Sequence, residues 1–260
     1  KNDGRGGPVH EEHISFDRLL VETVLRAEVL KELGLKKGDR VAFNLPNIPE
    51  QLYYTEAAKR LGIIYTPVFG GFSAKTLSDR IWDAGAKVVV TADGGYRNAE
   101  VVPYKEKFTD LALDNFIPRV TALTALTDTL STFDLPSDLK ARLQKQVEDA
   151  LTGEITLERS DVMRELGRAL DREEDLASEQ KADVRTSVAR ALADATHAVE
   201  TVVVIRYTGQ EIVKQSRDQW SHELVAKAAE RLVENARRVG FGQISSLDDI
   251  RKLEGRELWQ

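Results

Sequence analysis

Cysteine is absent from the 260 residues of this sequence. Its absence excludes disulfide bonds, cysteine-ligated zinc and catalysis by a thiol nucleophile. Histidine is scarce, and its four positions have no spacing that would put two metal ligands on one helix face, so no metal site is expected. These are His10, His13, His197 and His222. No G-x-S-x-G motif occurs either, and hydrolase chemistry therefore has no support.

Long apolar runs and a basic excess are also missing. No run approaches the roughly 18 residues that a membrane-spanning helix needs, and the N-terminus lacks the apolar segment of a secretory signal. Lysine and arginine number 37 against 43 aspartates and glutamates, a net charge of -6. We expect a cytoplasmic protein with no membrane and no nucleic-acid partner, although a basic pocket for one small anion is compatible with this balance.

Apolar residues are 42% of the chain, which is enough for a real core in one large domain or two smaller ones. After a polar lead-in arm, residues 1–13, helix and strand patterns alternate, and Gly34 and Gly62 stand where helices would end. Helices are expected at 15–33, 50–61 and 74–83, and strands at 40–44, 63–66 and 87–91. Alternation of this kind predicts a parallel sheet and an α/β fold class, with residues 14–105 forming its first part.

Residues 106–196 change in character, to charged segments with apolar residues every fourth position. The stripes are Leu139, Leu143, Val147, Leu151; Val162, Leu166, Leu170; and Val184, Val188, Leu192. They predict helices that must pack on one another or on the sheet, with Asp134, Ser160 and Ser178 as N-caps. Strand character returns at 200–207, where the apolar residues are nearly consecutive, and a helix follows at 221–239. Residues 106–196 are therefore interpreted as a helical insertion, and 197–260 as an incomplete continuation of the α/β subdomain.

Two short stretches are candidates for ligand contact. Gly70-Gly71 follows a predicted parallel strand, at the edge where open α/β sheets bind ligands. Spacing alone favours the alternative of a turn that needs a positive φ angle, because no dinucleotide or P-loop motif is present. Arg97, in "DGGYR", follows the next strand and could pair with a phosphate, or it could be a surface arginine in a flexible turn.

The quoted residues also carry a family resemblance. The block 34–105, with "VFGGFS" and "ADGGYR", and the block 202–225, "VVVIRYTGQEIVKQSRDQWSHELV", resemble the AMP-forming acyl-CoA synthetases of the acetyl- and propionyl-CoA synthetase branch. The likeness is greatest to the ligase domain of the propionyl-CoA synthases. These are fused enzymes that activate 3-hydroxypropionate as a CoA thioester, dehydrate it and reduce the product with NADPH.

The resemblance implies a two-step reaction. A carboxylate attacks the α-phosphate of MgATP to give an acyl-adenylate, and CoA then displaces AMP. By resemblance, Gly70 and Gly71 lie beside the pantetheine arm of CoA, with Gly71 closest, and Arg97 contacts its nucleotide end. The family commonly has a second basic residue three positions after that arginine. Here Glu100 stands in its place, and an acid there would repel the 3′-phosphate of CoA.

The family's other functional motifs do not occur in this sequence. Its phosphate loop, adenine-binding motif, ribose-binding aspartate and catalytic lysine are all absent, and the resemblance implies that they would follow Gln260. We therefore expect an N-terminal fragment without catalytic residues, whose partners are the remaining ligase, hydratase and reductase domains of one polypeptide; a homodimer is left open. NADPH applies only if a reductase is fused. The alternative is a non-enzymatic α/β module that binds CoA or docks a protein through its helices.

The insertion itself has two interpretations. It could cover the CoA or acyl entrance as a lid or docking face, or it could be a decoration at the periphery of the sheet. Charged helical faces are more often simply solvated, which favours the second. If the lid interpretation is right, deleting residues 107–195 from the full-length enzyme increases the leakage of reaction intermediates; unchanged leakage would contradict it.

Overall fold

A computed structural model describes residues 12–98, 100–196, 199–212, 214–240 and 244–252. Most of the predicted lead-in arm, with His10, and also His197, lie outside the described residues. The chain divides into two compact units, one drawn from residues 1–72, 84–107 and 199–260, and the other from 73–83 and 108–198. In the described part of the chain, no helix combines the length and apolar character needed to cross a bilayer.

Unit 1 is built on a five-stranded sheet in the order β2-β1-β3-β8-β9. Its strands are β1 (Arg40–Asn44), β2 (Ile64–Pro67), β3 (Val88–Ala92), β8 (Thr201–Ile205) and β9 (Asp218–Trp220). All four neighbouring pairs are parallel, which confirms the predicted α/β class. All five residues of β3 are buried, as are four of the five in β8, because a parallel sheet is covered on both faces. The sequence patterns did not reveal the short edge strand β9.

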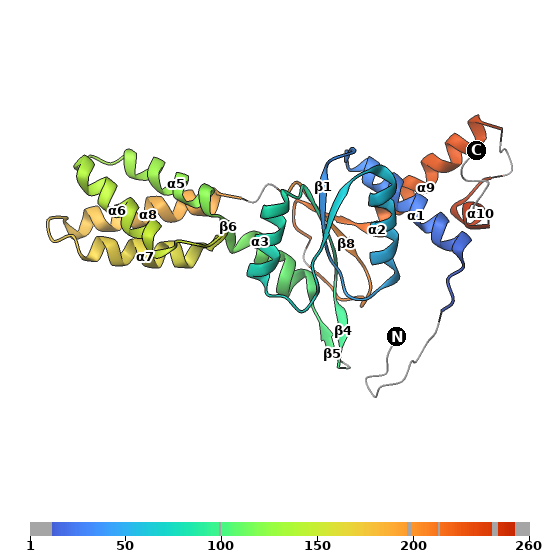
Figure 1. The fold of residues 1–260 in the computed structure, drawn as a ribbon, viewed down its shortest axis with the longest axis horizontal. Coiled ribbons are helices and arrows are strands. Elements are labelled where there is room, and N and C mark those ends of the chain that lie inside the picture. Colours follow the sequence, from blue (N-terminus) through green and yellow to red (C-terminus); the bar gives the residue numbers. More distant parts are fainter. Residues whose placement is uncertain (1–11, 99, 197–198, 213, 241–243, 253–260) are drawn as a thin grey trace. The chain divides into compact units, whose positions relative to one another are not determined.

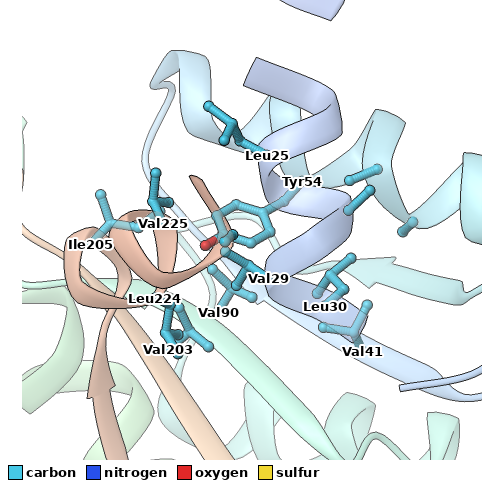
Figure 2. Close-up of a cluster of buried hydrophobic side chains, with 14 of the residues drawn as sticks. Leu25, Val29, Leu30, Val41, Tyr54, Val90, Val203, Ile205, Leu224 and Val225 are labelled. Carbon is cyan, nitrogen blue, oxygen red and sulfur yellow. The ribbon is translucent and has the colours of Figure 1, made fainter. Parts of the chain in front are cut away.

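Three helices cover one face of this sheet: α1 (Phe16–Glu32), α2 (Pro49–Leu61) and α9 (Ser221–Arg238) (Figure 1). The first two end as predicted, because Gly34 and Gly62 adopt left-handed φ angles of 77° and 67°. Figure 2 shows Tyr54 of α2 in the centre of the core, among side chains of α1, α9 and the strands. Its hydroxyl lies 2.9 Å from that of Ser221 on α9, which satisfies a polar group that burial would otherwise make costly.

Between β3 and unit 2 the chain forms a small hairpin and a short irregular helix. The hairpin consists of β4 (Gly95–Arg97) and β5 (Glu100–Val102), paired antiparallel. A π-helical segment, η1 (Lys105–Asp110), and α4 (Leu111–Asp114) follow it. The remaining short elements are α3 (Ala74–Ala84), as predicted, and α10 (Leu247–Lys252).

Unit 2 contains four longer helices and a two-stranded ribbon. They are β6 (Phe116–Pro118), α5 (Arg119–Ser131), α6 (Ser137–Ala150), β7 (Thr156–Glu158), α7 (Arg159–Asp171) and α8 (Ser178–Asp194). The three predicted stripes are all buried in one core, together with Ala122, Leu126 and Leu130 of α5. The stripes therefore face one another, as narrow apolar faces must if such helices are to be stable.

The predicted N-caps of these helices are wrong. Helix α7 begins one residue before Ser160, with Glu158 as its N-cap, and α8 begins at Ser178 itself. Asp134 lies before α6, whose N-cap is Pro136. The Ala177 backbone N–H donates instead to the side chain of Gln180, 3.1 Å away, so a residue inside the helix satisfies its start.

Unit 2 is also an internal repeat that the sequence analysis missed. Each half is a strand, an arginine and two helices, and the two strands pair around Ile117 and Leu157. The Arg119 backbone N–H donates to Ile155 O (3.0 Å), and that of Arg159 donates to Asn115 O (2.9 Å). The Arg119 side chain donates to carbonyls at the end of α6, and that of Arg159 to carbonyls at the end of α8. Each guanidinium thus satisfies helix-end acceptors that would otherwise lack partners.

Substitution within one stripe tests how far the stability of unit 2 depends on this core. Leu166→Ala on α7 removes a fully buried side chain and should lower the free energy of unfolding by about 2–5 kcal/mol. Denaturant unfolding followed by circular dichroism measures the loss, and amide hydrogen exchange assigns it to residues 119–194.

Arg164→Ala on the same helix is the matched control. Arg164 is half exposed and pairs with Asp161 on the surface, so its removal should cost much less than that of Leu166. Equal losses from the two variants would contradict the assignment of the stripe as the core of the unit.

Candidate functional site

A crevice of about 240 Å³ opens at the carboxyl edge of the sheet in unit 1. The ends of four adjacent strands supply its walls. Its lining is Leu45, Pro46 and Asn47 after β1; Phe69, Gly70 and Gly71 after β2; Tyr96, Arg97 and Tyr104 after β3; and Tyr207 after β8. Since open α/β sheets bind ligands at this edge, the crevice is the candidate site, and it brings together all three residues singled out from the sequence.

The two glycines are needed for close packing. They lie in a turn, closed by the Phe72 N–H donating to Phe69 O at 3.0 Å, but neither has a positive φ angle, so that part of the turn interpretation is wrong. A Cβ on Gly70 would lie 2.0 Å from the hydroxyl of Tyr104 and 2.5 Å from two of its ring carbons. A Cβ on Gly71 would meet only the ring of Phe69 at 2.9 Å, and that side chain is 67% exposed. The fold therefore requires glycine at position 70. At position 71 a larger residue could be accommodated, because the exposed ring of Phe69 can move aside.

Arg97 is a surface residue, as one of its two interpretations predicted, but it lies on a strand and not in a flexible turn. It is the last residue of β4, it is exposed, and its Cα is paired with that of Glu100 on β5. Antiparallel pairing holds the two side chains close, so the carboxylate lowers the positive potential that Arg97 offers an anion. The acid that departs from the family pattern is thus a direct neighbour of the proposed phosphate contact.

Three tyrosines form an aromatic wall that the sequence analysis did not single out. The rings of Tyr96 and Tyr207 meet edge to face, with centroids 5.8 Å apart and planes at 72°. Burial raises the pKa of Tyr207, and burial also raises the pKa of Tyr104 although the charge of Arg97 opposes it. Both hydroxyls therefore remain protonated near neutral pH and can donate hydrogen bonds.

A buried carboxylate binds the loop that carries Tyr207. Asp93 follows β3, is fully buried, and accepts four backbone N–H groups. The donors are Gly94 (2.7 Å), Tyr207 (2.9 Å), Thr208 (3.0 Å) and Gly209 (2.8 Å). Such charge-assisted bonds are among the stronger ones in proteins. The sequence signal was present in "ADGG", an aspartate and two glycines at the end of a buried strand.

A buried ion pair fixes the chain just after the hairpin of β4 and β5. The amine of Lys105 lies 3.0 Å from the carboxylate of Asp218 on β9, and both side chains are almost inaccessible. The same carboxylate accepts the backbone N–H of Gln215 at 2.8 Å. Removing either charge would leave the other buried and uncompensated, which is costly. The pair thus fixes the segment that carries Tyr104.

The described residues offer little else that suggests a site. No group of three or more histidine, aspartate or glutamate side chains in them could hold a metal ion. Of the histidines, His10 and His197 lie outside the described residues, and the ring of His222 contacts that of Trp220. Larger hollows exist, such as one of about 560 Å³ beside α5 and α6 in unit 2, but they are shallow and open. The strand-end crevice is smaller and better supported by its chemistry.

All residues that line the crevice lie within the part of the chain that matches a protein-family model. The model of the family described as "AMP-binding enzyme" matches residues 8–209. Acetyl-coenzyme A synthetase of Pseudoalteromonas translucida (strain TAC 125) is 40% identical over 113 residues, which are 44% of this chain and 18% of that protein. The enzyme of the same name from Campylobacter jejuni (strain 81-176) is 52% identical over 93 residues, 36% of this chain and 14% of that protein.

A relative with a different printed name also matches. The 3-hydroxypropionyl-coenzyme A synthetase of Sulfurisphaera tokodaii is 48% identical over 101 residues, 39% of this chain and 15% of that protein. The chain therefore spans less than a fifth of the length of these relatives.

Alanine substitutions at the two glycines should have unequal effects. Gly70→Ala forces its new methyl group into Tyr104 and should destabilise the chain by about 1–3 kcal/mol, the usual cost of overpacking. Gly71→Ala displaces only an exposed ring and should cost less than about 0.5 kcal/mol. Denaturant unfolding of both variants measures the difference.

A double-mutant cycle tests whether the collision with Tyr104 causes the destabilisation by Gly70→Ala. In a Tyr104→Ser background, Gly70→Ala should lose most of its cost, because the colliding ring is gone. If the cost persists unchanged, the collision with Tyr104 is not what excludes a side chain at position 70.

Proposed function

Because the chain belongs to the AMP-binding enzyme family, we propose that it forms the CoA-binding part of an AMP-forming acyl-CoA ligase. The observation that carries the proposal is the crevice, in which Gly70, Gly71 and Arg97 meet at the carboxyl edge of a parallel sheet inside the family match. The pantetheine arm of CoA would pass along Gly71, and Arg97 would take a phosphate of its nucleotide end.

The proposed reaction has two steps. A carboxylate oxygen attacks the α-phosphorus of MgATP, a phosphorus–oxygen bond forms, and pyrophosphate leaves. The sulfur of CoA then attacks the acyl carbon, AMP leaves, and the thiol proton passes to solvent. This chain would contribute to the second step, because a narrow crevice orients the thiol-bearing arm. The ATP site of the first step is proposed to lie in other residues of the ligase.

A short acid is the proposed substrate: acetate, propionate or 3-hydroxypropionate. Relatives named acetyl-coenzyme A synthetase and 3-hydroxypropionyl-coenzyme A synthetase support this range. In the fuller form of the proposal, the ligase is cytoplasmic and is fused to a hydratase and an NADPH-dependent reductase in a propionyl-CoA synthase. Unit 2 would then be available as a lid or docking face for those domains.

Two assays on the 260-residue chain test the proposal. The chain should bind CoA, as measured by calorimetry, and it should not exchange labelled pyrophosphate into ATP, because it lacks the ATP-binding motifs. Detectable exchange would refute the division of the ligase at this point. Absence of CoA binding would refute the assignment of the crevice. A non-enzymatic CoA-binding module would pass both assays, but its gene would end after Gln260 without the missing motifs.

Two charge variants refine the assay. Arg97→Ala should weaken CoA binding, and Glu100→Gln should strengthen it up to about fivefold at low salt, since an exposed charge contributes at most about 1 kcal/mol. Both effects should shrink as the salt concentration rises. An unchanged affinity in Glu100→Gln at low salt would show that no phosphate lies near the hairpin.

A further inference from the structure

Asp93 connects two parts of the crevice that are far apart in sequence. Its carboxylate accepts N–H groups from residues 207, 208 and 209, while its own N–H donates to Ile205 O at 2.9 Å. The end of β3 and the loop after β8 are therefore joined through one side chain. A fully buried carboxylate with four donors has little freedom to move, and neither has the loop that it binds.

The effect of this anchor reaches the crevice through Tyr207. The N–H of Tyr207 is one of the four donors, so the position of its ring depends on Asp93. That ring meets Tyr96 edge to face, and Tyr96, which is 43% exposed, lines the crevice together with Arg97. An exposed aromatic ring beside a guanidinium suits a planar aromatic group that carries phosphate, because it combines stacking with charge pairing.

We propose that Asp93 is a positioning residue of the crevice: through the loop 207–209 it holds Tyr207, and through Tyr207 it holds Tyr96 as the stacking surface for a nucleotide base beside Arg97. This inference rests on the proposed function, because it takes the base to be that of CoA. It goes further by assigning roles to Asp93, Tyr96 and Tyr207. Asp93 itself does not touch the ligand.

The alternative is that Asp93 only stabilises the fold and has no effect on ligand selectivity. The hydroxyl of Thr208 supports this alternative, since it is buried close to Gly94 and therefore contributes to packing. A general loss of stability would weaken every ligand of the crevice to the same extent. A positioning role would weaken only ligands that carry the base. The two interpretations therefore differ in ligand selectivity, which can be measured.

The test compares three probes on the 260-residue chain: CoA, adenosine 3′,5′-bisphosphate as its nucleotide half, and pantetheine as the other half. Asp93→Asn keeps the shape of the side chain but places an amide where four N–H groups need acceptors. We expect its dissociation constants for CoA and for the bisphosphate to rise by about tenfold or more, the range of a lost stacking contact. The constant for pantetheine should not change.

Asp39→Asn is the matched control. Asp39 also accepts a backbone N–H, from Lys36 at 2.8 Å, and pairs with Lys87, but it precedes β1 and so lies at the opposite end of the strands. All three dissociation constants should stay at their wild-type values. Equal weakening of all probes by Asp93→Asn, or no weakening of any, overturns the positioning role.

Tyr96 provides a second route if Asp93→Asn fails to fold. Tyr96→Ala should weaken CoA and the bisphosphate but not pantetheine, whereas Tyr96→Phe, which keeps the ring, should bind all three as the wild type does. Loss of binding in Tyr96→Phe, or none in Tyr96→Ala, overturns the stacking role. If the unaltered chain binds none of the probes, the proposed function itself has failed; if it binds CoA and the variants show no selectivity, only this inference has failed.

Discussion

The buried carboxylate of Asp93 is the interaction on which the candidate site most depends. It accepts four backbone N–H groups, three of them from a loop more than a hundred residues further along the chain. The carboxylate itself is fully buried, so these bonds replace the water that burial takes from it. The end of β3 and the loop after β8 are therefore held together although unit 2 separates them in the sequence.

Small residues are placed where the walls of the crevice approach each other. A Cβ on Gly70 would collide with Tyr104, and one on Gly95 would lie 2.8 Å from the same ring and 2.9 Å from Pro46. A Cβ on Gly94 would lie 2.8 Å from the hydroxyl of Thr208. In each case glycine is required by the bulk of a neighbour, not by its own backbone conformation, since none of the three has a positive φ angle. The tyrosines and the glycines are two parts of one packing arrangement.

Unit 2 obtains its stability by a different route. Its apolar stripes face one another in a core of its own, and its repeated arginines satisfy carbonyls at helix ends. The repeat escaped the sequence analysis because its two halves share spacing and little else: Val120 and Thr124 on α5 correspond to Ser160 and Arg164 on α7. Only the pairing of β6 with β7, centred on equivalent residues, makes the relation visible.

The sequence by itself determined the α/β class, the parallel strands, the helix ends at Gly34 and Gly62, and the family, because these depend on local periodicity, local backbone conformation and contiguous motifs. It also identified Gly70, Gly71 and Arg97 as candidates. Only the tertiary structure decided why Gly70 must be glycine, that Arg97 is paired with Glu100 on a hairpin, and that Asp93 organises the loop of Tyr207. These are contacts between distant segments, and no local pattern encodes which side chain will occupy the space opposite.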